Sequence, residues 1–161
     1  MNTEDPSLAS PEVVTQVLTL GRKVSHLILA AMTIHAEIAF PKGIGPAPDA
    51  EEHGNTPMDQ ASDHMTQATL ASHLADIYRE LASLTAKSLN CPAALIKVVV
   101  TRLLDSILHV QGSLQGICER FAASSPPNLV VLLALRGQVL TEMVSRLSKV
   151  VDAAPRVILA S

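Results

Sequence analysis

Apolar residues recur along most of this chain at alternating steps of four and three, and this spacing predicts long amphipathic α-helices. The row is clearest between Pro11 and Pro41, where it runs without a break. Such a pattern is typical of helices that pack side by side along their whole length. No segment shows the strict alternation of apolar and polar residues expected of a half-buried β-strand. The members of this first row are Val13, Val17, Leu20, Val24, Leu27, Ala31, Ile34 and Ile38.

Capping residues and prolines divide the chain into four helical segments. Ser10 suits the N-cap position and Pro11 the first helical turn, while Pro41 ends the first segment. Asn90 ends the second segment and Pro92 starts the third after a short turn, which makes these two helices antiparallel neighbours. The expected helices cover about residues 11–40, 57–90, 92–123 and 127–154.

The later segments carry apolar rows of the same kind. Four helices of matched length, with short turns between the last three, predict an all-α fold. We expect an antiparallel bundle of four long helices that forms a single domain over residues 1–161. In the second segment the row is Leu70, Leu74, Ile77, Leu81 and Leu84. In the third it is Ile96, Val99, Val100, Leu103, Ile107, Val110, Leu114, Ile117 and Phe121, and in the fourth it is Leu129, Leu133, Leu140, Val144, Leu147 and Val151.

Three stretches fall outside the predicted helices. Residues 41–56 combine prolines, glycines and an acidic cluster without periodicity, which indicates one long mobile linker after the first helix. Residues 1–9 are expected to form a polar N-terminal tail. Residues 154–161 are expected to form a C-terminal tail, because Pro155 should end the last helix.

Composition narrows the classes of function. Aromatic residues make up only 2% of the chain and the formal net charge is −3, so neither base stacking nor electrostatic attraction favours direct binding of nucleic acid. The apolar runs are shorter than the ~20 residues of a membrane span, and the acidic N-terminus does not resemble a secretory signal. We therefore expect an intracellular protein without membrane contact. Cys91 and Cys118 have no metal or redox spacing and are expected to be reduced thiols.

The first and fourth helices carry a second apolar row beside the first. Hydrophobic residues account for 48% of the chain and charged residues for 17%, a more apolar balance than that of a typical small monomer. We predict that the second rows bind a protein partner or a second copy of the chain, most simply as a homodimer. The predicted partner-binding residues are Val14, Leu18, Ile28 and Met32 in the first helix and Leu132, Leu135, Val139 and Met143 in the fourth.

Histidines and carboxylates form one candidate polar site. His73 and Asp76 share one helix face, as do Asp105 and His109 on the next helix. These four residues could form an acid/base or metal site, and the alternative is that they make local ion pairs beside the core. The Glu-x-x-His pairs of metal-bearing bundles are absent. No catalytic residue, metal ligand or cofactor is therefore predicted.

Other chemically notable residues have simpler structural explanations. His26 and His35 lie one place beside the first apolar row and are expected at its boundary. Cys118 is expected to pack as a small hydrophobic residue rather than to react as a thiolate. Gly112 and Gly116 lie four residues apart on the third helix, where they would admit a neighbouring helix or open a pocket.

Part of the chain resembles a known family. Residues 104–108 read LDSIL, residues 121–125 read FAASS, and residues 127–135 continue as the Leu-rich segment PNLVVLLAL. This order is similar to the C-terminal helical region of fungal pathway-specific transcription regulators of the aflatoxin-regulatory-protein type. Ser124 and Ser125 stand where that family often has cysteines, and the zinc binuclear cluster that binds DNA is absent. The resemblance implies the regulatory half of such a regulator and a location in the nucleus.

The predicted function is a non-catalytic helical interaction or regulatory domain. An alternative is a protein or enzyme that binds a small apolar ligand in a cavity within the bundle, and a third is a metal-bearing bundle. The position of ionisable side chains separates these classes, since a catalytic bundle directs two or more of them into its core. Without the family resemblance, a cytoplasmic location is expected.

Overall fold

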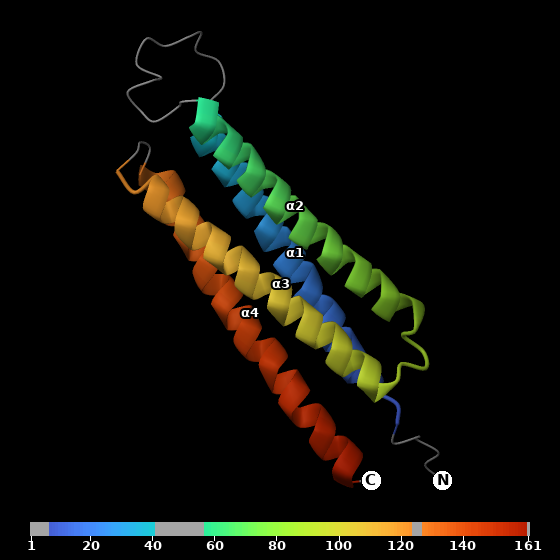
Figure 1. The fold of residues 1–161 in the computed structure, drawn as a ribbon. Coiled ribbons are helices and arrows are strands. Elements are labelled where there is room, and N and C mark those ends of the chain that lie inside the picture. The colour runs from blue at the N-terminus through green and yellow to red at the C-terminus, as the bar shows by residue number, and fades with distance from the viewer. Residues whose placement is uncertain (1–6, 41–56, 124–126, 161) are drawn as a thin grey trace.

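The protein is described from a computed structural model that places residues 7–40, 57–123 and 127–160 (Figure 1). These residues form four α-helices joined in the order expected from the sequence. The prediction of an all-α, four-helix bundle is confirmed. The predicted linker at residues 41–56 lies outside the described residues. The helices are α1 (Pro11–Ala39), α2 (Pro57–Ala86), α3 (Ala93–Arg120) and α4 (Pro127–Ala160).

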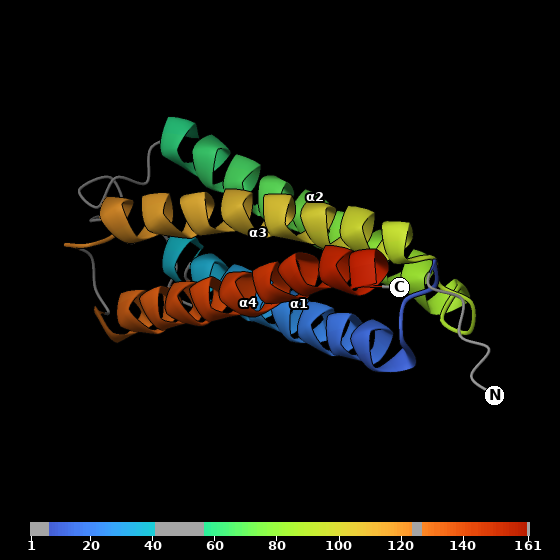
Figure 2. The same ribbon diagram turned by 90° about the horizontal axis from the view of Figure 1, so that it is seen from below.

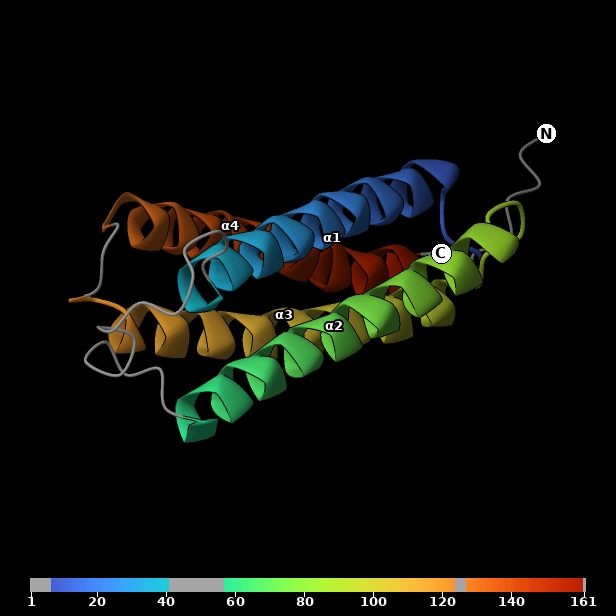
Figure 3. The same cartoon turned by 90° about the horizontal axis from the view of Figure 1, so that it is seen from above.

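Consecutive helices run in opposite directions, and each packs on the next (Figure 1). α4 closes the bundle by packing on α1. Views from below and above show two layers, one of α1 and α4 and one of α2 and α3 (Figure 2 and Figure 3). α1 also contacts α3 across the bundle, whereas the described parts of α2 and α4 do not touch. In both views α2 diverges from α3 towards the first residues of α2.

Local sequence explains where the helices begin and end. The Ser10 hydroxyl accepts a hydrogen bond from the Val13 amide at 3.3 Å, and Pro11 occupies the first turn of α1. The Phe40 amide closes α1 by donating to the Ala36 carbonyl at 2.8 Å. Pro92 stands at the N-cap of α3. α1 and α3 thus begin where the sequence signals predict, whereas α2 ends at Ala86, before the expected end at Asn90.

The apolar rows fill the bundle interior. The predicted rows of α2 and α3 are buried throughout, and Leu133, Leu140 and Leu147 are the fully buried members of the α4 row. In α1 the buried row is turned slightly from the predicted one, so that Val13 is only partly buried while Val14 is in the core. The row at the centre of the bundle in α1 is Val14, Val17, Gly21, Val24, Ile28, Ala31 and His35.

Both predicted tails need correction where the structure describes them. Ser7, Leu8 and Ala9 pair with residues 91–93, because the Ala9 amide donates to the Cys91 carbonyl and the Ala93 amide to the Ser7 carbonyl, each at 2.7 Å. Residues 7–9 are therefore anchored rather than a free tail. The predicted C-terminal tail is wrong for residues 154–160, since α4 continues to Ala160. A proline removes one helical hydrogen bond and need not end a helix.

Two helical segments, Pro11–Ala39 and Asn128–Val150, are long and apolar enough to cross a membrane by length and composition. Core helices of soluble proteins meet the same criterion. The bundle buries the two segments to different extents. In α1, 39% of the most apolar stretch is buried, whereas in α4 the buried share is 17%. α4 thus carries more apolar surface than its neighbours cover.

Candidate functional site

The outer side of α4 bears a patch of apolar side chains in the first half of the helix. We call this patch the α4 surface and define it by Val131, Leu132, Leu135 and Val139. Between 36% and 56% of each residue is exposed. The four positions lie within about a quarter of the helix circumference, given 100° per residue. They therefore form one continuous apolar strip rather than scattered contacts with solvent.

The α4 surface continues into a groove between α4 and α1. The groove has a volume of about 410 Å³. Val139 joins it to the α4 surface, and the lining combines aliphatic side chains with two cationic ones, Lys23 and Arg136. The remaining lining residues are His26, Leu27, Ala30 and Met143.

The predicted partner-binding residues divide into three groups by exposure. Leu132, Leu135 and Val139 are exposed as predicted. Leu18 and Met32 are partly buried against the core. The surface assignment is wrong for the other three. Val14, Ile28 and Met143 are at most 4% exposed, because Val14 and Ile28 belong to the central row of α1 and Met143 packs towards the core.

The predicted polar residues do meet between α2 and α3, although not as one site. The His73 and His109 rings stack with their centroids 5.3 Å apart. His109 is also 3.8 Å from the Asp105 carboxylate. Asp76 instead pairs with Arg79 on its own helix, with 3.1 Å between Oδ1 and Nη1. No group of three or more potential metal ligands is found in the described residues.

A second polar cluster, which the sequence reasoning missed, lies inside the bundle. We call it the His35 cluster: His35 of α1, Asp63 and Gln67 of α2, and Arg120 of α3. His35 and Asp63 are 0% and 1% exposed. The predicted boundary position of His35 is therefore wrong, because the residue ends the central row of α1. Asp63 and Gln67 likewise extend the row of Leu70 towards the start of α2.

Hydrogen bonds define the protonation state of His35. The Gln67 side-chain amide donates to the Met32 carbonyl at 2.9 Å and to Nδ1 of His35 at 2.7 Å. Because Nδ1 accepts, the ring proton of neutral His35 is on Nε2, which faces Oδ1 of Asp63 at 3.4 Å. This arrangement selects the uncharged imidazole.

Arg120 supplies the positive charge of the cluster. Its Nη1 donates to Oδ1 of Asp63, its Nη2 is 4.0 Å from Asp59, and its guanidinium lies 4.6 Å from the centre of the Phe121 ring. Within the described residues, Oδ2 of Asp63 has no hydrogen-bond partner. Burial lowers the pKa of His35 below its ordinary value, the Arg120 charge acts in the same direction, and Asp63 opposes the shift.

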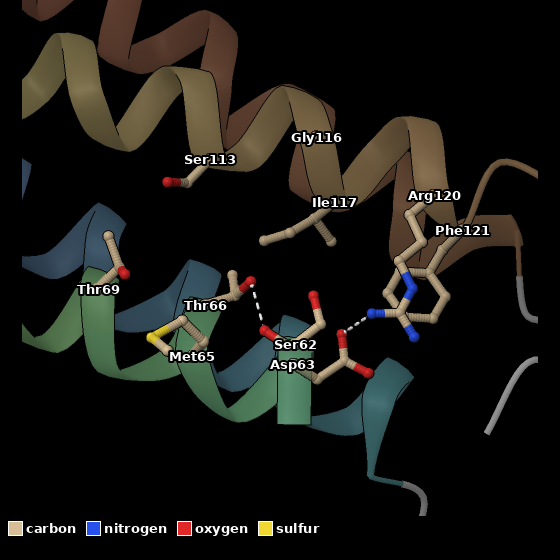
Figure 4. Close-up of a pocket in the computed structure, with 10 residues that line it drawn as sticks. All are labelled: Ser62, Asp63, Met65, Thr66, Thr69, Ser113, Gly116, Ile117, Arg120 and Phe121. Atoms are coloured by element: carbon tan, nitrogen blue, oxygen red, sulfur yellow. Dashed lines mark hydrogen bonds and ion pairs between the residues drawn. The ribbon is translucent and has the colours of Figure 1, made fainter. Parts of the chain in front are cut away.

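A groove of about 330 Å³ runs between α2 and α3 beside this cluster (Figure 4). Figure 4 shows Asp63 and Arg120 joined at one end of the groove, with hydroxyl side chains along the rest of its lining. Met65, Ile117 and Phe121 form its apolar part. Gly116 contributes open space, since a Cβ atom added there would meet nothing within 4 Å, whereas Gly112 does not line this groove. The hydroxyl-bearing lining residues are Ser62, Thr66, Thr69 and Ser113.

The cysteines do not add a reactive centre. Both are free thiols, Cys91 buried and Cys118 partly buried. Burial raises the pKa of each thiol, so the thiolate that would act as a nucleophile is disfavoured. Neither the α2–α3 groove nor the His35 cluster contains a cysteine.

Comparisons with protein families, with curated proteins and with solved structures found no match to this chain.

Proposed function

We propose that this chain is a helical interaction domain that associates with a second copy of itself through the α4 surface. The observation that carries the proposal is the exposure of Val131, Leu132, Leu135 and Val139 as one strip. Continuous apolar surface of this kind on a small bundle marks a site of association, because water contact with it is unfavourable.

The charges beside the strip favour a second copy as the occupant. Arg136 lies three residues before Val139, and Glu142 lies three residues after it. Two α4 helices that cross antiparallel at Val139 bring Arg136 of one copy beside Glu142 of the other, twice by symmetry. Among the described residues Arg136 makes no ion pair, whereas Glu142 pairs with Arg146 at 2.7 Å. A symmetric contact of this kind thus places the Glu142 carboxylate of the second copy beside Arg136.

Insertion into a membrane explains α4 less well. Arg136, Glu142, Arg146 and Lys149 all lie within the segment Asn128–Val150. A charge at the centre of a bilayer costs about 2.5–3.5 kcal/mol, so Arg136 and Glu142, which lie near the middle of this segment, oppose spanning. The apolar strip also occupies only one side of the helix, which suits a helix–helix contact.

The likeness of residues 104–135 to the C-terminal region of fungal pathway-specific regulators supports a regulatory role for this association. In such a role the domain would bring together two copies of a regulator, and DNA would be read by another polypeptide segment. This part of the proposal depends on the resemblance and not on the α4 surface.

The test replaces Leu135 and Val139 together by glutamate and measures mass by size-exclusion chromatography with light scattering. Four like charges at a symmetric contact oppose association, so Leu135→Glu/Val139→Glu should be a monomer with unchanged helical circular dichroism. The matched control is Leu108→Glu, an exposed leucine of α3 that is not part of the α1–α4 groove. This variant should associate like the wild type.

Three outcomes contradict the proposal. A wild-type chain that is monomeric at tens of micromolar has no self-association to explain. Unfolding of the double variant would place the two side chains in the monomer core. Binding of the wild type to phosphatidylcholine vesicles, lost in the double variant, would assign the strip to a membrane instead.

A further inference from the structure

The first part of α2, residues 58–69, has almost no apolar anchor in the bundle. Asp63 is the only buried residue in this range, and both Met58 and Met65 are exposed. From Leu70 onward, by contrast, α2 buries an aliphatic side chain at each step of its row. The position of residues 58–69 therefore depends on polar and ring contacts.

Histidines supply several of these contacts. His35 of α1 meets Asp63 and Gln67, and the His64 ring of α2 stacks on Phe40 at 4.5 Å. Further along α2, the stack of two imidazoles described above joins the helix to α3. Among the described histidines, only His26 lies away from α2, in the groove between α1 and α4.

We propose that protonation of His35 releases residues 58–69 of α2 from α1 and α3, and so makes this end of the bundle a pH-sensitive switch. His35 is the trigger because it is fully buried and because its hydrogen bonds fit only the neutral ring. The switch is independent of the proposed self-association, since α2 does not touch α4 in the described residues.

A second ring proton disrupts the cluster directly. Protonated Nδ1 is a donor, so it would face the amide donor of Gln67 across the present 2.7 Å contact. The charged groups around the ring do not compensate for this loss. Asp63 of α2 already pairs with Arg120 of α3, and Arg120 also lies near Asp59 of α2 and repels a charged imidazole. α4 brings no described charged group to the cluster.

The direction of the pH effect follows from proton linkage. In the closed bundle the pKa of His35 is lowered, whereas the released ring has the ordinary histidine pKa of about 6.5. The released form therefore binds the proton more readily. As the pH falls below about 6.5, the ratio of released to closed form rises by up to tenfold per pH unit, until the lowered pKa of the closed form is reached.

The test is hydrogen–deuterium exchange with mass spectrometry on the full chain from about pH 7.5 to about pH 5, the range in which histidine gains its charge. Exchange is corrected for its chemical pH dependence. Protection of residues 58–69 should fall by roughly tenfold or more, while residues 70–84 and α4 lose less. His35→Gln retains an acceptor for Gln67 and a donor for Asp63 without titrating, so its protection should stay constant. His26→Gln is the matched control and should behave like the wild type.

Several results would overturn the switch. One is constant protection of residues 58–69 in the wild type. Another is a loss of protection in His35→Gln as large as that in the wild type. A third is a loss of protection in α4 as large as that in residues 58–69, which would indicate global acid unfolding. If His35→Gln fails to fold, a nitrogen-15 NMR titration of the wild-type histidine rings replaces it. Protonation of His35 must then coincide with the loss of protection, and release while the ring stays neutral refutes the proposal.

Discussion

Asp63 carries the only buried carboxylate among the described residues, and Arg120 is the group that makes its burial tolerable. Taking a carboxylate out of water costs several kcal/mol unless a partner compensates for the lost hydration. Arg120 can do so from the edge of the bundle, because about 29% of its side chain is exposed while its guanidinium reaches inward. Removal of Arg120 leaves an uncompensated buried charge.

Arg120→Met should therefore lower the free energy of unfolding by about 2–3 kcal/mol, somewhat less than for a fully buried pair because water reaches this site. Urea denaturation followed by circular dichroism measures the change. Arg79→Met, which breaks the exposed pair with Asp76, is the matched control and should cost less than about 0.5 kcal/mol. Adding Asp63→Leu to Arg120→Met should restore part of the loss. Equal effects of the two arginine changes would show that the buried pair contributes little.

At the scale of the helices, α3 could be predicted almost completely and α1 only in part. The α3 row is buried as expected from Ile96 to Phe121, although apolar residues such as Val98 and Leu108 also lie outside it on exposed positions. α1 has apolar residues at both Val13 and Val14, so two adjacent rows fit the same spacing. Which row is central depends on the neighbouring helices, and their positions cannot be obtained from the α1 sequence.

The same limit, that one helix sequence does not give the positions of the other helices, applies to the candidate sites. The exposed strip at Leu132, Leu135 and Val139 could be predicted because α4 has more apolar positions than one core-facing side can use. The His35 cluster could not, since its members come from three helices and each looks like an ordinary boundary residue in its own sequence. A polar residue that continues an apolar row, as Asp63 continues the row of Leu70, was the one available signal.

Substitution of Gly21 by alanine tests how closely α1 packs on α2. Gly21 is buried in the central row, and a Cβ atom at this position would collide with the Leu81 side chain. Alanine normally stabilises a helix interior by about 0.5–1 kcal/mol relative to glycine. Gly112→Ala, where a Cβ atom meets nothing within 4 Å, should show that gain in thermal denaturation. Gly21→Ala should instead destabilise by about 1 kcal/mol or more through overpacking. Similar gains at both positions would contradict the close contact between the helices.

For the whole molecule, the proposed self-association and the proposed pH response involve different parts of the bundle. The exposed apolar strip lies on α4. The start of α2, which belongs to the other layer (Figure 3), is held by the His35 cluster. Self-association and the pH response should therefore be separable by mutation. His35→Gln should leave the mass of the assembly unchanged, and light scattering checks this.

Sedimentation equilibrium of the wild-type chain measures directly whether the protein associates with itself, as proposed for the α4 surface. The single chain has a mass of 17.0 kDa. The average mass should rise towards twice this value with concentration over the micromolar range and should not exceed it, because a symmetric contact closes on itself. A mass of one chain at every concentration, or a mass that grows without limit, would contradict a symmetric dimer formed through the α4 surface.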